Sequence, residues 1–382
     1  GTTAGGASAA PAQRNASMKA AVLRTVGAPL QLEDVELDEP GAGEVLVRIE
    51  AAGVCHSDLH YMTGDLLAKL PIVVGHEGAG IVEAVGPQAS GRVSVGDRVA
   101  LLWRPRCGEC EACVAGNPVL CRFGRVLATT NGLMDGTTRL HLNDERIHHL
   151  MGVSCFAERV VVSETSVLPV PDGVPPEIAA ISACAVITGV GAVLNVVQRP
   201  AGQPLAVFGT GGVGLAAVMG AALTAAHPVI AIDIDPVKLE LAQRFGATHV
   251  VNAGEGNVVD QILELSDGGV PWMIDTVGRP ETMRQAIACL RPAGTLVAIG
   301  LSSADATVPV PINELVQRQK RIVGSLYGSS NPRIDLPRIF ALYLAGRLPL
   351  DELVGRRRPL AEVNEAYDEL RTGGVGRMIL LP

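Results

Sequence analysis

The chain has 382 residues, too many for one ordinary core, and this length predicts two domains of roughly 150 to 200 residues each. Hydrophobic residues make up 48% and charged residues 18%, a composition that excludes a disordered chain. With 39 acidic against 31 basic side chains the net charge is -8, so no basic surface is expected for a nucleic acid.

The chain starts with residues 1–17, rich in Gly, Ala and Ser and without an apolar stretch. This composition predicts a flexible tail or an expression remnant and no secretory leader, so we expect a cytoplasmic protein. From Met18 to about Val99, short β-type runs are interrupted by Gly and Pro. This pattern predicts a β-barrel-like lobe.

The stretch Ala179–Val197 carries no charge and is long enough for a membrane span. Its two glycines, its scattered Ser, Thr and Asn, and its α/β surroundings favour a buried helix, so no membrane contact is expected. Beyond Pro204, apolar strands alternate with helical patterns, which predicts a parallel sheet covered by helices. From about residue 328 the pattern returns to helices and a final strand, as expected of a tail that rejoins the first lobe.

A GxGxxG motif, Gly209, Gly211 and Gly214, lies between an apolar strand and an Ala-rich helix. The first glycine permits a tight turn, the second a close approach of pyrophosphate, and the third close packing of helix on strand. Asp233 ends the next strand, where its carboxylate would accept hydrogen bonds from ribose hydroxyls and repel a phosphate, which favours NAD over NADP. The alternatives are a glycine turn that only packs a βα unit and an Asp233 that is a solvated strand end.

Four of the eight cysteines lie in one loop with the spacing CxxCxxCx7C. Four thiolates close a tetrahedron around zinc and leave no position for substrate, so this motif predicts a structural metal. An iron–sulfur cluster, disulfides and free buried thiols are the alternatives. The motif consists of Cys107, Cys110, Cys113 and Cys121.

Three further candidate ligands lie far apart in the sequence: Cys55 in GVCHSD, His76 in GHEGAG and Cys184 in ISACAVITG. Alone, each is more typical of a small buried side chain or a core histidine than of a ligand. Together with the other motifs, in this order and spacing from Met18 to Pro382, they closely resemble the zinc-containing medium-chain alcohol dehydrogenases.

The resemblance implies an α/β fold: a GroES-like β-rich catalytic domain over residues 18–185, completed by 328–382, and a Rossmann doubly wound parallel-sheet domain that binds NAD over 186–327. It also implies two zinc ions per chain. Cys55, His76 and Cys184 would hold the catalytic zinc, which keeps one position for substrate oxygen and lowers the pKa of the alcohol so that an alkoxide forms. Asp58 would orient His76, and Glu77 would lie near the metal and assist ligand exchange. For these two carboxylates a strand-end cap and an ordinary core ion pair are the alternatives.

The resemblance further assigns a proton relay and cofactor contacts. Ser57 would contact the substrate oxygen and connect through the cofactor ribose to His60, unless His60 is a plain surface histidine. His56 stands where the family often has a pyrophosphate-binding Arg, and Arg377 matches a second phosphate-contacting Arg or is a solvated strand residue. The full set of expected cofactor contacts is His56, Thr188, Gly209, Gly211, Gly212, Val213, Gly214, Asp233, Lys238 and Arg377.

Positions that line the family's substrate pocket correspond here to Leu66, Trp103, Val126 and Leu150, with Phe156 on the same loop. Core packing is the alternative for each of them. Trp103 is large and is expected to narrow the pocket.

The segment 136–156 resembles the dimeric branch that includes liver-type and thiol-dependent formaldehyde dehydrogenases, so a homodimer is expected. The glutathione-dependent enzymes place an acidic residue near the position of Leu66, whereas Arg125 does resemble their anion-binding position. We therefore favour a primary, allylic or aromatic alcohol, or its aldehyde, as substrate. A glutathione- or mycothiol-type formaldehyde dehydrogenase and a non-catalytic nucleotide-binding protein are the alternatives.

Overall fold

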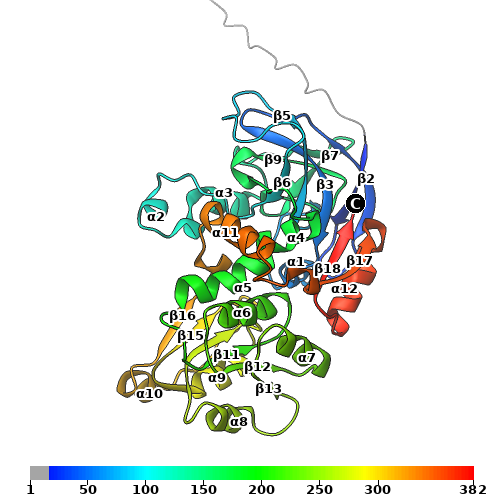
Figure 1. Cartoon of the computed structure of the whole chain (residues 1–382). Coiled ribbons are helices and arrows are strands. Elements are labelled where there is room, and N and C mark those ends of the chain that lie inside the picture. The colour runs from blue at the N-terminus through cyan, green and yellow to red at the C-terminus, as the bar shows by residue number, and fades with distance from the viewer. Residues whose placement is uncertain (1–16) are drawn as a thin grey trace, which may run out of the picture.

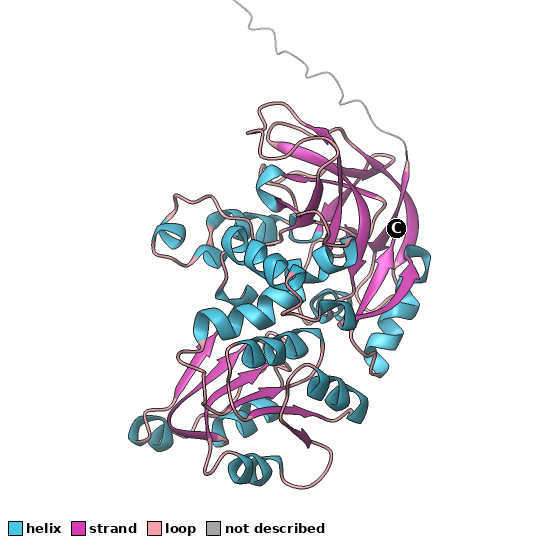
Figure 2. Cartoon of the chain, viewed as in Figure 1, coloured by secondary structure: helices cyan, strands magenta, loops and turns pink. Residues whose placement is uncertain are grey.

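The computed structural model describes residues 17–382, so the predicted tail lies outside the described residues except for Ser17. The chain forms two lobes (Figure 1). One lobe is built mainly of antiparallel strands, and the other is a parallel sheet with helices on both faces (Figure 2). This arrangement is the predicted α/β fold.

The first lobe begins with a small closed barrel. Apolar residues of its strands point into the barrel. In β1, for example, every residue except Lys19 is buried. The strand order is β1 (Met18–Leu23), β2 (Gln31–Leu37), β7 (Leu140–Leu142), β8 (Glu145–His149) and β4 (Ile72–Val73).

A larger sheet packs beside this barrel. Its strand order is β10 (Val167–Pro169), β6 (Arg98–Leu101), β5 (Gly78–Val85), β3 (Glu44–Gly53), β18 (Arg377–Leu381) and β17 (Val354–Pro359), with β9 (Arg159–Ser163) also paired to β3. The last strand of the chain, β18, thus pairs antiparallel with β3, and Figure 1 shows the two strands side by side. The C-terminal tail therefore rejoins the first lobe.

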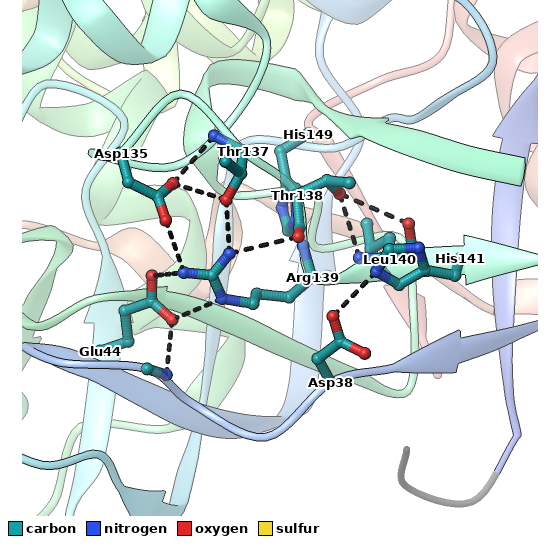
Figure 3. A network of polar contacts seen from close by, with 10 residues as sticks. Asp38, Glu44, Asp135, Thr137, Thr138, Arg139, Leu140, His141 and His149 are labelled. Carbon is teal, nitrogen blue, oxygen red and sulfur yellow. Dashed lines mark hydrogen bonds and ion pairs between the residues drawn. The ribbon is translucent and has the colours of Figure 1, made fainter. Parts of the chain in front are cut away.

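A polar network ties the barrel to this sheet (Figure 3). Arg139, next to β7, donates to both oxygens of Glu44 at the start of β3, at 3.0 and 2.8 Å. Its guanidinium also reaches Asp135 at 2.8 Å, and its backbone N–H donates to the ring of His149 at 3.2 Å. His149 is completely buried.

The second lobe is a six-stranded parallel sheet. Its strand order is β13 (His249–Asn252), β12 (Val229–Asp233), β11 (Leu205–Phe208), β14 (Val270–Asp275), β15 (Leu290–Ala298) and β16 (Arg321–Gly324). Every residue of β11 is buried because helices cover both faces of the sheet. These helices are α6 (Gly212–Leu223), α7 (Pro236–Arg244), α8 (Val258–Leu265), α9 (Pro280–Ala288) and α10 (Ile312–Gln317).

A buried helical run connects the lobes. It consists of α4 (Pro176–Ile181), a π-helical turn Ser182–Val186, α5 (Ile187–Gly191) and a second π-helical turn Ala192–Val196. This run is long and apolar enough to cross a membrane, but 89% of its most apolar window is buried inside the protein. The prediction of a buried helix is confirmed for this segment.

The remaining helices belong to the first lobe and its tail: α1 (His56–Thr63), α2 (Glu111–Val114), α3 (Arg122–Thr130), α11 (Pro332–Leu344) and α12 (Val363–Thr372). Elements that the sequence did not predict include β16, β17 and the short loop helices α2 and α3. The two missed strands are mostly exposed, so they lack the continuous apolar pattern by which the other parallel strands were recognised.

Candidate active site

Cys55 lies where β3 has ended and α1 begins. It is the residue before the first turn of α1, with extended backbone angles, and its side chain is 5% exposed. The positive end of a helix dipole stabilises a thiolate at this position. A hydrogen bond with Cys184, followed by the charges of Arg377 and His76, holds the pKa of the Cys55 thiol well below its ordinary value despite its burial.

Three predicted ligands from distant segments converge here. The Sγ atoms of Cys55 and Cys184 and a ring nitrogen of His76 all lie within 4.8 Å of one another, and all three residues are buried. Cys184 comes from the π-helical turn Ser182–Val186, a distortion that is frequent at functional sites. The fold therefore brings these three residues, which are far apart in the sequence, into one site.

The spacing of these donor atoms fits a tetrahedral zinc ion. Bonds of about 2.3 Å to sulfur and 2.0 Å to nitrogen place two such ligands about 3.5 Å apart. His76 Nε2 lies 3.3 Å from Cys184 Sγ. Two thiolates and one imidazole fill three positions and leave a fourth for a substrate oxygen, the pattern of a catalytic zinc site.

The two predicted carboxylates, Asp58 and Glu77, have different partners. Asp58 accepts the Nδ1–H of His76 at 2.9 Å, which turns Nε2 toward the two sulfurs. Glu77 is not one of the converging donors. Its carboxylate instead forms a buried bidentate ion pair with Arg377, at 2.8 and 2.7 Å. Gly53 makes room for this pair, because a Cβ there would overlap the carboxylate of Glu77.

The four clustered cysteines also converge. Their Sγ atoms lie within 4.8 Å of one another, with Cys107 and Cys113 4.0 Å apart and Cys110 and Cys121 3.8 Å apart. A tetrahedron with zinc–sulfur bonds of about 2.3 Å has edges of about 3.8 Å, whereas a disulfide needs about 2.05 Å. All four are free thiols. Backbone N–H groups of Arg122 and Cys113 lower the pKa of Cys110 to about 6, as suits a metal ligand.

The glycines of the GxGxxG motif have the three environments that the motif predicts. Gly209 has a φ of +85°, which allows the tight turn after β11. A Cβ at Gly211 would meet no atom within 4 Å, so the backbone is open to a ligand, while a Cβ at Gly214 would overlap the carbonyl oxygen of Gly209. The backbone N–H groups at the start of α6 are thus available to a phosphate.

Further cofactor candidates surround this turn. Asp233, at the end of β12, accepts hydrogen bonds from the backbone N–H and the hydroxyl of Thr210 at 2.6 and 2.9 Å. Arg377 approaches the start of α6, since a Cβ at Gly212 would lie 3.1 Å from its Cδ. Thr188 lies one helical turn after Cys184, and Lys238 is partly buried on α7. His56 is exposed in the first turn of α1, and Val213 directly precedes Gly214.

Ser57 and His60 share one face of α1, because they are three residues apart on a helix. Ser57 is partly buried. The ring of His60 contacts Asp65 through Nδ1 at 3.0 Å, which leaves Nε2 without a partner among the described residues. The hydrogen bond to His60 lowers the pKa of Asp65 below its ordinary value.

The predicted pocket residues fall into two groups. Trp103 is 9% exposed and packs edge-on against the ring of His76, with the ring centroids 5.8 Å apart. Val126, on α3, and Leu66 are partly buried. Leu150 and Phe156 are completely buried, and Phe156 packs against Gly75 and Tyr367 as a core residue.

Two residues of this region were missed by the sequence analysis. Tyr327 packs on Trp103 at 4.7 Å and donates its hydroxyl to the carbonyl oxygen of Ala183 at 2.6 Å, next to Cys184. Arg104 places its guanidinium 5.3 Å from the centre of the Trp103 ring. No local motif marks either residue; only the adjacency of Arg104 to Trp103 was visible in the sequence.

The fold and the donor sets define a two-domain, zinc-binding, nicotinamide-dependent dehydrogenase. Two family models match the chain: one described as an alcohol dehydrogenase GroES-like domain over residues 41–172, and one described as a zinc-binding dehydrogenase over residues 212–343. Together with the relatives below, they show that the chain belongs to the zinc-containing medium-chain alcohol dehydrogenase family. The resemblance is thereby confirmed, and the chain is an oxidoreductase of the alcohol dehydrogenase type.

Relatives of different specificity are similar over nearly the whole chain. An NDMA-dependent alcohol dehydrogenase of Amycolatopsis methanolica is 39% identical over 93% of this chain and 96% of its own. An S-(hydroxymethyl)glutathione dehydrogenase of Komagataella pastoris is 36% identical over 95% and 97%. The crystal structure of benzyl alcohol dehydrogenase from Acinetobacter calcoaceticus has a TM-score of 0.90 at 33% identity, covering 96% of this chain and 99% of that one.

Proposed function

We propose that this chain is an NAD-dependent, two-zinc dehydrogenase that transfers a hydride between a small primary, allylic or aromatic alcohol, or its aldehyde, and the cofactor. The observation that carries this proposal is the convergence of Cys55, His76 and Cys184 beside the start of the dinucleotide-binding helix. The similarity to a benzyl alcohol dehydrogenase supports the aromatic part of the substrate class.

Zinc at this site supplies Lewis acidity, which lowers the pKa of an alcohol oxygen. The nicotinamide supplies the hydride acceptor. The residues of the chain position these groups. Asp58 fixes the ring of His76, and Thr188 is proposed to lie against the nicotinamide because it follows Cys184 by one helical turn. The Glu77–Arg377 pair holds the guanidinium rigidly beside the start of α6, where the pyrophosphate is expected.

The alcohol proton must leave a closed site. Ser57 would accept this proton, and His60, on the same face of α1, would release a proton to solvent. Asp65 supports this role because its contact with Nδ1 holds the His60 ring in one orientation and leaves Nε2 for exchange with solvent.

NAD is proposed over NADP because the carboxylate of Asp233 lies beside the glycine turn, where a ribose phosphate would be repelled. A structural zinc is proposed at the four-cysteine loop, because its sulfur spacing suits a closed tetrahedron.

The proposal is tested by zinc analysis of the purified protein and by the appearance of NADH absorbance when benzyl or allyl alcohol is added. We expect about two zinc ions per chain, alcohol-dependent reduction of NAD, and much slower reduction of NADP. A protein that holds both metals but reduces neither cofactor with any alcohol would contradict the proposed activity.

A thiol-adduct formaldehyde dehydrogenase is the second candidate. It is favoured by Arg125, exposed on α3, and by the similarity to an S-(hydroxymethyl)glutathione dehydrogenase. Leu66 is evidence against this candidate, because the glutathione-dependent enzymes have an acidic residue near this position. The adjacent Asp65 already accepts hydrogen bonds from His60 and Thr63. Adding formaldehyde with and without glutathione or mycothiol distinguishes the two, because only the second candidate depends on the thiol.

We further propose a cytoplasmic homodimer. The eight free thiols suit a reducing compartment. Strand β16 ends the parallel sheet and pairs only with β15 among the described residues, and the neighbouring helix α10 exposes Ile312 and Val316. Figure 1 shows this edge at the outside of the lobe. An unpaired edge flanked by apolar side chains favours pairing with a second copy, which the molar mass in solution would test.

A further inference from the structure

Arg104, beside the proposed substrate pocket, is a cation for which the described part of the chain supplies no counter-ion. Its side chain is partly buried. Among residues 17–382, no hydrogen bond or ion pair joins this guanidinium to another residue, and its Nε is completely buried without a partner. An arginine stays charged at all physiological pH values, so burial of this group without an anion is costly.

The surroundings of Arg104 hold it in one position. The guanidinium lies over the Trp103 ring, with Cζ 5.3 Å from the centroid, within the range of a cation–π contact. On its other side the aliphatic part packs against α3, since a Cβ at Gly124 would lie 2.9 Å from the Cδ of Arg104. A stacked guanidinium presents the N–H groups at its edge to whatever enters beside the ring.

Trp103 connects this cation to the metal ligands. The other neighbours of the indole are the His76 ring, edge-on at 5.8 Å, and the Tyr327 ring at 4.7 Å. One indole therefore separates Arg104 from a ligand of the proposed catalytic zinc. A substrate whose oxygen lies at the metal and whose body passes Trp103 would bring its far end to the guanidinium.

The nearby charges do not neutralise Arg104. Asp58 is committed to His76, and Tyr61 on α1 is neutral near pH 7, since burial raises its pKa further. Arg125 adds a second cation on α3 for which the structure gives no side-chain partner among the described residues. Neither Asp58 nor Tyr61 therefore supplies a counter-charge for Arg104, and Arg125 adds no negative charge to this region.

We propose that Arg104 determines specificity by binding a carboxylate on the substrate, so that the preferred alcohols or aldehydes carry a carboxylate at the end remote from the reacting oxygen. This inference rests on the proposed alcohol dehydrogenase activity and narrows its substrate class. A carboxylate suits this site because its two oxygens can accept two parallel hydrogen bonds from one guanidinium, and its negative charge neutralises the positive charge of the arginine. The pairing provides hydrogen-bond partners for guanidinium N–H groups that have none among the described residues.

The test compares matched pairs of substrates: benzyl alcohol with 4-(hydroxymethyl)benzoate, and primary alcohols with ω-hydroxycarboxylates of increasing length. We expect kcat/KM of the native enzyme to favour the carboxylate member of at least one pair. Arg104→Met, which keeps the packing on Trp103, should lower that preference by about ten- to a hundredfold and leave the neutral alcohol nearly unaffected. Arg104→Lys should retain part of it. Arg122→Met is the control. Arg122 lies on α3, the helix against which Arg104 packs, but it is exposed and already paired with Glu109, so its loss should not change the preference.

Binding gives a second readout that does not depend on turnover. Trp103 and Trp272 are the two tryptophans of the chain, so in a Trp272→Phe background a carboxylate on Arg104 should alter the emission of Trp103. The titration with 4-(hydroxymethyl)benzoate should weaken in Arg104→Met. Equal substrate preference and equal binding in native protein and Arg104→Met overturn the inference while alcohol oxidation still stands. Binding of the carboxylate that depends on Arg104, without oxidation of any alcohol, overturns the proposed activity instead.

Discussion

The contact between Asp58 and His76 is the residue-scale feature on which the proposed catalytic zinc most depends. Both side chains are fully buried, and Asp58 also accepts the N–H of Gly75 at 3.3 Å. Carboxylates that orient a ligating imidazole typically contribute 10- to 100-fold to metal affinity or activity.

We therefore predict that Asp58→Asn weakens zinc binding at the catalytic site by about 10- to 100-fold, because the amide no longer favours a protonated Nδ1. Competition with a chelator measures this affinity. Asp38→Asn is the control, since Asp38 also contacts a histidine ring, Nε2 of His141 at 2.8 Å, but far from the proposed ligands, in the barrel. Equal zinc retention in both variants would show that Asp58 does not position His76.

The predicted selectivity for NAD over NADP depends on Asp233. Asp233→Ala removes the carboxylate that would repel a ribose phosphate, so we expect the ratio of kcat/KM for NAD to that for NADP to fall by about tenfold or more. Glu240→Ala, on the exposed face of α7, is the control. An unchanged ratio in Asp233→Ala would remove the basis for NAD selectivity.

At the scale of elements, different glycines of the turn before α6 serve helix packing and cofactor binding. Gly211 precedes α6 and Gly214 lies within its first turn, and a methyl group would meet open space at Gly211 but the Gly209 carbonyl at Gly214. Two alanine substitutions therefore test two functions of one loop.

Gly211→Ala should leave the free energy of unfolding within about 0.5 kcal/mol of the native value but weaken NAD binding, because the methyl group occupies the approach of the pyrophosphate. Gly214→Ala should weaken NAD binding and also destabilise the protein by about 1 to 3 kcal/mol through overpacking. Denaturant unfolding and NAD titration measure the two effects. Stability loss in Gly211→Ala equal to that in Gly214→Ala would contradict this division.

Element recognition from the sequence worked where side-chain patterns are strong. The buried run of β11, the Ala-rich α6 and the cysteine loop could be predicted because burial and metal binding restrict the residue types allowed. Strands β16 and β17 lie at sheet edges with exposed side chains, so no such restriction marked them. The π-helical turn at Cys184 is buried throughout, and no pattern in the sequence distinguishes it from an ordinary apolar helix.

The same limit applies to the site. The ligands could be predicted from family motifs, but the pairing of Glu77 with Arg377 joins residues 300 positions apart and required the return of β18 to β3. The stacking of Arg104 on Trp103 likewise depends on the path of the loop after β6. Tertiary contacts of this kind follow from topology rather than from local spacing.

At the scale of the whole molecule, stability should depend on pH through the network of Figure 3. Burial, followed by the charges of Arg139 and His148, lowers the pKa of His149 to about 3. Because the folded-state pKa is depressed below the unfolded value of about 6.5, the contribution of His149 is fully present above pH 6.5 and is lost progressively as the pH falls toward 3. Asp135 acts in the same direction at lower pH: burial raises its pKa, but hydrogen bonds from Arg139 and Thr137 outweigh this and hold the pKa at about 2.

We predict that acidification from pH 6.5 toward pH 3 costs on the order of 4 kcal/mol at His149 alone. His149→Gln keeps an acceptor for the backbone N–H of Arg139 and removes the titrating group, so its free energy of unfolding should fall less steeply over this range. Denaturant titrations at several pH values measure the slope, with His249→Gln, in the other lobe, as the control. Parallel slopes in native protein and His149→Gln would exclude this residue as a source of acid sensitivity.

The most direct measurement of the central claim is the zinc content of Cys55→Ala, determined together with its rate of alcohol oxidation. If Cys55, His76 and Cys184 hold one metal beside the cofactor, the variant should keep about one zinc per chain, at the four-cysteine loop, and lose hydride transfer by about a thousandfold or more. A Cys55→Ala protein with native zinc content and native turnover would contradict the account.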